Sequence, residues 1–246
     1  MKKITFAFLV LTLLFLPIFI NADENELLEL ISQTTKYYKT VIYPNYSLNL
    51  STSNENIISQ TIEISKEEYD NSDLHVTDTT IETTYKKLSS SIFKKDNYYR
   101  YKAVLTWKTM PSVKSYDIIA IGFYQSVKIK NNNLYFTQDY CLSSGKCSST
   151  SSNYPQVFAG GAGTSFKLQS GSLSSLSQTL YFDIEKNTTG TITSQLVSAD
   201  YAHATGSISL ANSKKFTVNS NGITLNGVSS YYDNMNAAKT YWSGSW

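Results

Sequence analysis

The amino-acid sequence predicts an all-β protein: an antiparallel β-sandwich or jelly-roll-like domain with a short helix near its N-terminus. From about residue 74 onward, apolar and polar residues alternate with a period of two, as on strands that bury one face. Short candidate strands recur between turns rich in Asn, Gly, Ser and Pro, and helical spacing is scarce. Many short strands at such spacing are typical of sandwiches and jelly rolls.

Residues 1–22 predict a secretory signal peptide. Lys2 and Lys3 precede an apolar run over 4–20, and Ala22 offers a small residue at the cleavage position. A retained membrane anchor is the alternative, but a run of 17 residues is short for a span of about 20. We therefore expect cleavage, an extracellular location and no stable membrane anchor in the mature protein.

Residues 23–70 predict an N-terminal helix and linker region. Over 24–33, Leu and Ile stand at mixed helical spacing behind acidic residues, which favours a short helix. Residues 36–56 are rich in Tyr, Asn and Ser and contain Pro44, which favours a linker or an irregular strand. The region is too small to bury a core of its own, so we do not treat it as a separate domain.

Residues 71–246 predict the β-sandwich domain. The alternation is most regular over 99–107, while 116–129 is richer in apolar residues and predicts a central strand covered on both faces. The segments 142–153 and 159–163 have the composition of loops. Further strands are expected at 76–88, 134–140, 178–185, 191–198, 205–210, 214–218 and 223–228.

The two cysteines, Cys141 and Cys147, predict a disulfide. An isolated pair in an exported chain is usually oxidised, and Ser144 and Gly145 between them can turn the chain back. Two thiols without a partner His are too few for a zinc site, and the chain has only two histidines, His75 and His203. We expect no zinc or iron site and no cofactor, although an all-oxygen calcium site stays open.

The charge balance argues against nucleic acid as a partner. The chain carries 21 basic and 19 acidic residues, and the surplus is Lys2 and Lys3. Without residues 1–22 the chain is formally neutral. The full chain has abundant Tyr and 61 Ser and Thr residues. Binding to phosphates depends on clustered Lys and Arg, so a neutral chain disfavours it.

Carboxylates and one histidine are the candidates for catalysis. His203 follows Asp200 by three residues, a spacing that separates the side chains on a strand but lets them meet in a turn. The ordinary interpretation is a packed histidine bonded locally. A secreted polysaccharide hydrolase is the alternative function, and it would need two acids to flank a sugar bond in one cleft. Its candidate acids are Asp117, Asp183, Glu185 and Asp200.

Two other motifs admit functional interpretations. The glycines Gly160, Gly161 and Gly163 resemble a phosphate loop only superficially, since no Gly-Lys-Ser/Thr ending or helix follows, and a loop between strands is expected. The segment 178–197 reads as a Ser/Thr-rich amphipathic hairpin. Such hairpins occur in pore formers, so a β-pore-forming or host-directed toxin is a further alternative, although its arms are shorter than a spanning strand.

Aromatic residues near the C-terminus suggest the leading function. Flat rings of Tyr and Trp can stack on the apolar faces of sugars, and the same residues are enriched at protein interfaces. The ordinary alternative is that they close one end of the sandwich. We expect a non-enzymatic extracellular or cell-envelope binding module with a carbohydrate or cell-wall ligand, bound by Tyr231, Tyr232, Tyr241, Trp242 and Trp246.

One string resembles a family signature. Trp107, Met110-Pro111, Ser115 and Asp117, followed later by Ala-Asp-Tyr-Ala-His-Ala at 199–204, resemble uncharacterised secreted proteins of Gram-positive bacteria, the Firmicutes. The resemblance extends over about residues 100–246 and implies no activity. On structural grounds we expect Trp107 in the core at a sandwich corner and Asp117 capping a turn.

Overall fold

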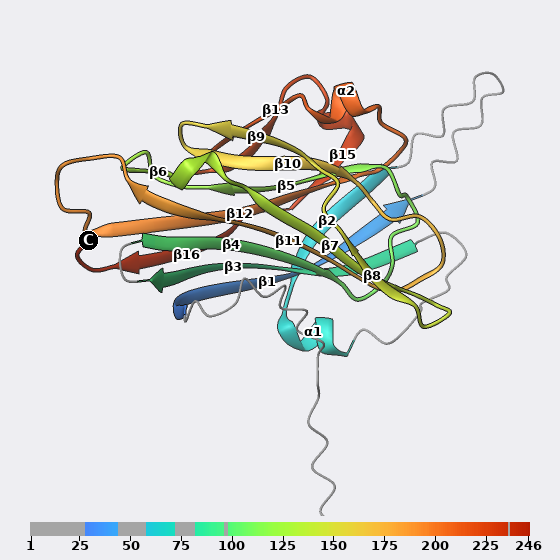
Figure 1. Cartoon of the computed structure of the whole chain (residues 1–246). Helices are drawn as coiled ribbons and strands as arrows, with labels where there is room; N and C mark the ends of the chain where they lie inside the picture. The colour runs from blue at the N-terminus through green and yellow to red at the C-terminus, as the bar shows by residue number, and fades with distance from the viewer. Residues whose placement is uncertain (1–27, 44–57, 72–81, 96–97, 236) are drawn as a thin grey trace, which may run out of the picture.

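The computed structural model describes residues 28–43, 58–71, 82–95, 98–235 and 237–246. Across these ranges the strands form two antiparallel sheets that pack face to face, with a small two-stranded sheet outside one of them (Figure 1). The predicted all-β sandwich is therefore confirmed. The predicted signal peptide at 1–22 lies outside the described residues.

The first sheet carries the long N-terminal strands. Its strand order is β2 (Ile58–Ile64), β1 (Glu29–Tyr43), β3 (Glu82–Lys95), β4 (Tyr98–Trp107), β11 (Leu173–Lys186), β7 (Tyr135–Leu142) and β8 (Cys147–Thr150). The short strand β6 (Val127–Ile129) also pairs with β11, beside β7.

The second sheet faces the first. Its strand order is β15 (Tyr232–Asn234), β12 (Ser194–Ala204), β5 (Tyr116–Gly122), β10 (Gly161–Lys167) and β9 (Tyr154–Phe158). The strand β16 (Ala238–Ser243) also pairs with β12. The hairpin of β13 (Phe216–Asn219) and β14 (Gly222–Leu225) lies outside this sheet, near α2 (Leu210–Ser213) (Figure 1). Three further short helices are α1 (Lys66–Asp70) and the 3₁₀ turns Lys130–Asn132 and Ser229–Tyr231.

The main core lies between the two sheets. β4 alternates strictly between inward and outward side chains, as its sequence predicts, and Trp107 is 3% exposed within the core. β5 is buried on both faces, because Ile119 and Ile121 point into the main core. Ile118 and Ala120 instead pack against the β13–β14 hairpin. The predicted central strand over 116–129 is thus confirmed for 116–122, and a turn separates it from β6.

The helix predicted over 24–33 is wrong in its described part, because Glu29–Tyr43 is the strand β1. β1 pairs with β2 on one side and with β3 on the other, so its backbone groups are satisfied laterally. β-branched and aromatic residues such as Thr34, Thr35 and Tyr38 favour this state. A helix is present later, among the described residues 58–71: α1 begins after the N-cap Ser65.

Three other local predictions also need correction. Residues 178–197 do not form a hairpin: β11 lies in the first sheet and β12 in the second, so their apolar faces meet across the core. The strand predicted at 205–210 is absent: residues 205–209 link β12 to α2, which begins at Leu210. The loop predicted at 142–153 contains the strand β8. Lateral strand pairing decides each case, and local composition does not encode it.

The glycine cluster has a packing role. Gly160 lies in the turn after β9, while Gly161 and Gly163 lie in β10, so the predicted loop is partly strand. A Cβ at Gly161 would come within 2.4 Å of Val218 Cγ1, and one at Gly122 within 1.9 Å of the Asn219 carbonyl oxygen. Because glycine has no side chain, Gly122 and Gly161 let the β13–β14 hairpin lie directly on the sheet.

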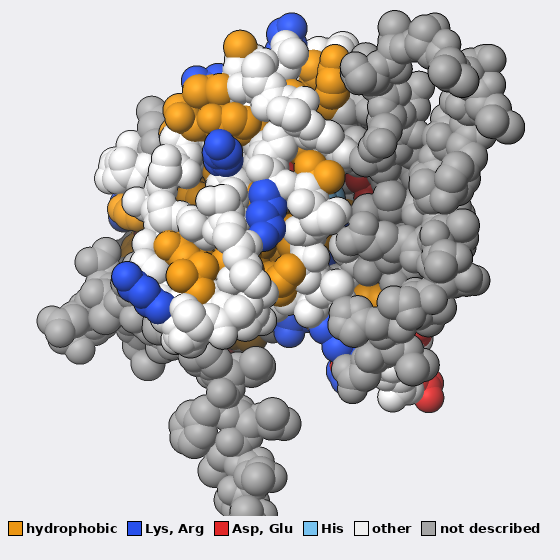
Figure 2. Space-filling model, turned by 90° about the vertical axis from the view of Figure 1, so that its right-hand side faces the viewer, with side chains coloured by type: hydrophobic (Ala, Val, Ile, Leu, Met, Phe, Trp, Pro, Cys, Tyr) orange, Lys and Arg blue, Asp and Glu red, His pale blue; other side chains and the backbone are white. Residues whose placement is uncertain are grey.

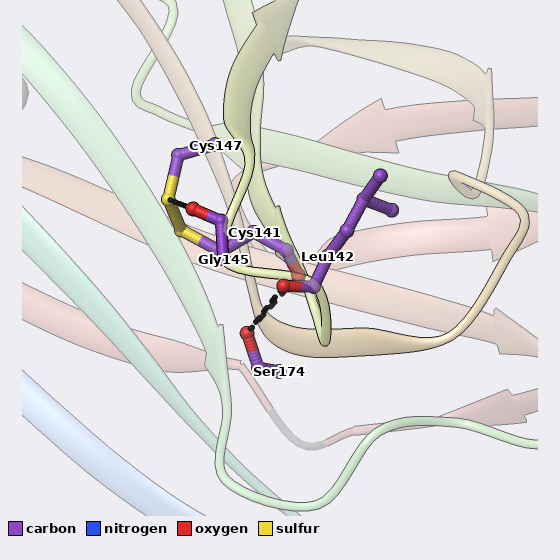
Figure 3. The surroundings of a disulfide bond; sticks show 5 residues. All are labelled: Cys141, Leu142, Gly145, Cys147 and Ser174. Atoms are coloured by element: carbon purple, nitrogen blue, oxygen red, sulfur yellow. Dashed lines mark hydrogen bonds between the residues drawn. A yellow bond between two sulfur atoms is a disulfide. The ribbon is translucent and has the colours of Figure 1, made fainter.

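The predicted disulfide is present. Cys141 and Cys147 are directly opposed residues of β7 and β8, and a turn with Gly145 at φ +88° joins the strands. Ser174 Oγ donates to the carbonyl oxygens of Cys141 and Leu142, at 3.3 and 3.2 Å (Figure 3). The disulfide thus joins the two strands of the β7–β8 hairpin at the edge of the first sheet. Pairing of β7 with β11 also supports this hairpin.

Candidate ligand-binding surface

The five predicted binding aromatics do not form one platform. On β12, Ala204 is opposite Tyr232, whereas Gln195 is opposite Trp242. Nine residues of strand separate these positions, or about 30 Å at about 3.3 Å per residue. Tyr232 is also buried, at 7% exposed, whereas Tyr231 is 42% exposed.

Two of the five aromatics meet at the C-terminal end of the sandwich. The rings of Trp242 and Trp246 lie 5.2 and 4.7 Å from the ring of Tyr99, centroid to centroid, and both indoles are partly buried against the core. Trp246 also exchanges two backbone hydrogen bonds with Ile192. We call Tyr99, Trp242 and Trp246 the tryptophan cluster; it closes this end of the core. Tyr241 is 58% exposed and takes no part in it.

A second aromatic group lies on the outer face of the first sheet, where β7, β11 and β4 are neighbours (Figure 1). Tyr135 and Tyr181 are directly opposed across β7 and β11, and their rings stack at 4.9 Å with an interplanar angle of 8°. The Arg100 guanidinium covers Tyr181 at 4.7 Å. We call Tyr135, Tyr181, Arg100 and Asp183 the tyrosine surface.

Polar groups hold the tyrosine surface in place. Arg100 donates from Nε and Nη2 to the two carboxylate oxygens of Asp183, at 2.7 and 3.1 Å, a bidentate geometry that orients both side chains. Lys102 lies opposite Tyr181 on the neighbouring strand, where burial and then the Arg100 charge lower its pKa. The surface therefore combines a rigid aromatic stack with oriented donors and acceptors.

A hollow adjoins the tyrosine surface. It has a volume of about 390 Å³ and is lined by Asn133, Leu134, Tyr135, Pro155 and Val157. Tyr135 belongs to both features and is 41% exposed, while Val157 on β9 is 46% exposed. The hollow thus adds exposed apolar groups next to Tyr135, the residue through which it adjoins the tyrosine surface.

The four acids of the hydrolase alternative lie in three different places. Asp183 pairs with Arg100, and Glu185 pairs with Lys128 at 3.2 Å, both on the outer face of the first sheet. Asp117 is wholly buried inside the sandwich, and Asp200 lies under the β13–β14 hairpin. These carboxylates do not converge in one cleft.

His203 and Asp200 do not pair; His203 instead joins Asp117 in a buried network. His203 Nδ1 lies 2.8 Å from Asp117 Oδ2, and the Tyr201 hydroxyl donates to the same oxygen. The Ala204 amide donates to Asp117 Oδ1 at 2.9 Å. Trp107 packs edge-on against His203, with ring centroids 5.0 Å apart. Asp117 therefore holds three residues of β12 against β5. It lies within a strand, so the prediction that it caps a turn is wrong.

Asp200 has a different environment. The amides of Tyr201 and Ile223 donate to its carboxylate, at 2.9 and 2.8 Å. Burial nevertheless raises its pKa from 3.8 to about 7, against the lowering effect of these amides and of the Lys239 charge. The carboxyl group joins β12 to β14, so it fastens the outer hairpin to the sheet.

Charge is dispersed on the visible surface. On the end of the molecule drawn in Figure 2, Lys and Arg side chains stand among uncharged ones. Among the described residues, no group of three or more His, Cys, Asp or Glu side chains has the arrangement of a metal site. The same part of the chain contains no helix that is long and apolar enough to cross a membrane.

Comparison with known proteins adds little to this geometry. No family model matches the chain, and no curated protein matches it. A solved structure titled BspA_C_WT has a TM-score of 0.32 and 8% sequence identity, over 67% of this chain and 79% of that one. A likeness this distant identifies no family.

Sequence reasoning missed the tyrosine surface. Tyr135, Tyr181 and Arg100 occupy outward positions of three separate strands, so they become neighbours only through the pairing of β7, β11 and β4. The alternating pattern could have marked each as outward-facing. Their juxtaposition, however, depends on strand order and register.

Proposed function

We propose that the protein is a secreted, non-enzymatic binding module that acts outside the cell or at the cell envelope, with a carbohydrate as its ligand. The observation that carries the proposal is the tyrosine surface beside its hollow. The stacked Tyr135–Tyr181 pair and the Arg100–Asp183 pair share one sheet face.

This combination suits sugars for two reasons. Pyranose rings present apolar C–H faces, which pack on aromatic rings such as the exposed Tyr135, and they carry hydroxyls that need oriented donors and acceptors. Arg100 has five N–H donors, and Asp183 engages only two of its nitrogens. The Arg100 and Asp183 side chains are each 20% exposed, so they can meet a ligand in solution.

Secretion is part of the same proposal. The predicted signal segment at 1–22 and the Cys141–Cys147 disulfide support it, since disulfides persist chiefly in oxidising compartments. The neutral, Ser- and Thr-rich composition suits a ligand without charge. The resemblance to secreted proteins of Gram-positive bacteria makes their cell walls the first material to test.

The test is a pull-down of the purified protein with Gram-positive cell walls and with insoluble polysaccharides such as chitin and cellulose. Tyr135→Ala should weaken retention roughly tenfold, or about 1.4 kcal/mol, since it removes the exposed ring. Tyr231→Ala is the matched control, because Tyr231 is 42% exposed and Tyr135 41% exposed. Tyr231 lies beside β15, at the far edge of the other sheet.

The outcomes separate the candidate surfaces. Retention lost in Tyr135→Ala and kept in Trp242→Ala supports the tyrosine surface. The opposite pattern would place binding at the tryptophan cluster and overturn its assignment to the tyrosine surface. Retention on none of these materials contradicts the carbohydrate proposal itself.

A further inference from the structure

Lys86 is a buried amine without an ordinary partner. Its side chain is 0% exposed on the inward face of β3, and Nζ has no hydrogen-bond partner among the described residues. The ring of Trp107 lies 5.1 Å from Nζ. Burial lowers the pKa of Lys86 to about 8, against the opposing charges of Asp233 and Asp117. The amine is therefore much easier to deprotonate than a lysine in water, and a neutral amine is a nucleophile.

A carboxylate from the opposite sheet faces this amine. Asp233 Oδ2 lies 3.9 Å from Lys86 Nζ, and the Asp233 side chain is 5% exposed. Lys86 belongs to the first sheet and Asp233 to the second, through β3 and β15. Thr61 on β2 donates a hydrogen bond to Asp233 Oδ2 and so orients the carboxylate. An ion pair this deeply buried gains little over its desolvation cost, so stability alone does not explain it.

Asp117 is the other acid near Lys86, but it is already engaged. Its two oxygens accept from the Tyr201 hydroxyl and the Ala204 amide and contact His203 Nδ1. Among the described residues, the carboxylate of Asp233 contacts only the Thr61 hydroxyl and the distant Lys86 amine. Of the two acids, Asp233 is therefore the one left open to attack.

We propose that Lys86 and Asp233 form an intramolecular isopeptide bond that joins the two sheets. One proton passes from the ammonium to the carboxylate, which leaves a neutral amine facing a carboxylic acid. Nζ then bonds to Cγ of Asp233, and the C–OH bond breaks. The hydroxyl leaves with a second proton from the nitrogen as one water molecule. The step is a condensation, so it needs no oxidant, reductant or cofactor.

The location favours this reaction. Water is excluded around both groups, which disfavours hydrolysis of the amide product. The fold holds the two groups as neighbours, so the reaction is intramolecular and gains from proximity. A bond here would link β3 to β15 across the core. Its effect would be to resist separation of the sheets, independently of any ligand on the tyrosine surface.

The test is mass spectrometry of the purified full chain after reduction of the disulfide. The intact mass should be lower, by one water molecule, than that calculated from the N-terminus found by sequencing. A protease digest should yield one branched peptide that contains both Lys86 and Asp233. Lys86→Met and Asp233→Ala should each restore the full mass and give two separate peptides.

Two controls sharpen the result. The Lys128–Glu185 pair is closer, at 3.2 Å, but its side chains are 54% and 42% exposed, so its peptides should stay separate in the same digest. In Asp233→Asn the same attack would release ammonia in place of water, and the product would have the wild-type mass. Wild-type protein with the full mass and separate Lys86 and Asp233 peptides would overturn the proposal, and this outcome does not depend on whether any variant folds.

Discussion

His203 Nδ1 lies 2.8 Å from Asp117 Oδ2, although Asp200 is the carboxylate nearest to His203 in the sequence. The two residues belong to neighbouring strands, β12 and β5, and both point into the core between the sheets. Asp117 also contacts Tyr201 and the Ala204 amide, so one carboxylate serves three groups of β12. This junction therefore ties three residues of β12 to one residue of β5.

Asp117→Ala should destabilise the protein by about 3–5 kcal/mol, because it leaves His203, Tyr201 and the Ala204 amide buried without their partner. Urea unfolding at pH 7 measures the change. Glu185→Ala is the control, since Glu185 forms an exposed pair with Lys128 and should cost no more than about 1 kcal/mol. Equal losses in the two variants would show that the Asp117 network contributes no more to stability than an exposed ion pair does.

Asp200 should make stability depend on pH. Its pKa is raised to about 7 in the folded protein and lies near 3.8 in the unfolded chain, so the folded state holds the proton more tightly. The stabilisation that this proton provides is complete below about pH 3.8 and is lost as the pH rises to about 7. Each pKa unit corresponds to about 1.4 kcal/mol.

The measurement for Asp200 compares wild type and Asp200→Asn by urea unfolding from pH 4 to pH 8. The asparagine does not titrate. The free energy of unfolding of Asp200→Asn should therefore increase relative to that of the wild type as the pH rises. Most of the change should occur below about pH 7. A difference that stays constant over this range is the result that contradicts the prediction.

Gly122→Ala should lift the outer hairpin from the sheet, since a Cβ there would lie 1.9 Å from the Asn219 carbonyl oxygen. We expect a loss of about 1–3 kcal/mol or more, as for other overpacked sites. Thermal unfolding gives the size of the effect. Gly206→Ala is the matched control, because a Cβ at Gly206 meets nothing within 4 Å, and its stability should stay within about 0.5 kcal/mol of wild type.

Removal of the disulfide should cost about 2 kcal/mol. The bond closes a short loop between Cys141 and Cys147, which are six positions apart, and loop-closure entropy for so few residues is modest. The double variant Cys141→Ser, Cys147→Ser should unfold at a lower urea concentration with an unchanged slope. A midpoint equal to that of the wild type would mean that pairing of β7 with β11 already holds this edge.

Much of the architecture could be predicted from local pattern. The alternation over 99–107 predicts β4 and its buried face, including Trp107, because side chains on a strand alternate between its faces. The helix predicted over 24–33 fails in its described part, because pairing with β2 and β3 overrides a weak local preference. The 178–197 hairpin fails for a related reason: two amphipathic strands can pair laterally or face each other across a core, and their sequences look the same.

The candidate site shows the same division. Tyr241 and Trp242 are adjacent in the chain, yet only Trp242 packs against the core, while Tyr135 and Tyr181 stack although they are far apart in the sequence. The strand content, the buried face of β4 and the disulfide could be predicted without coordinates, because they follow from periodicity and spacing along the chain. The partner of His203, the proximity of Lys86 to Asp233 and the composition of the tyrosine surface emerge only when the sheets are assembled. Those contacts depend on the order and register of strands, which are set by packing over the whole sandwich.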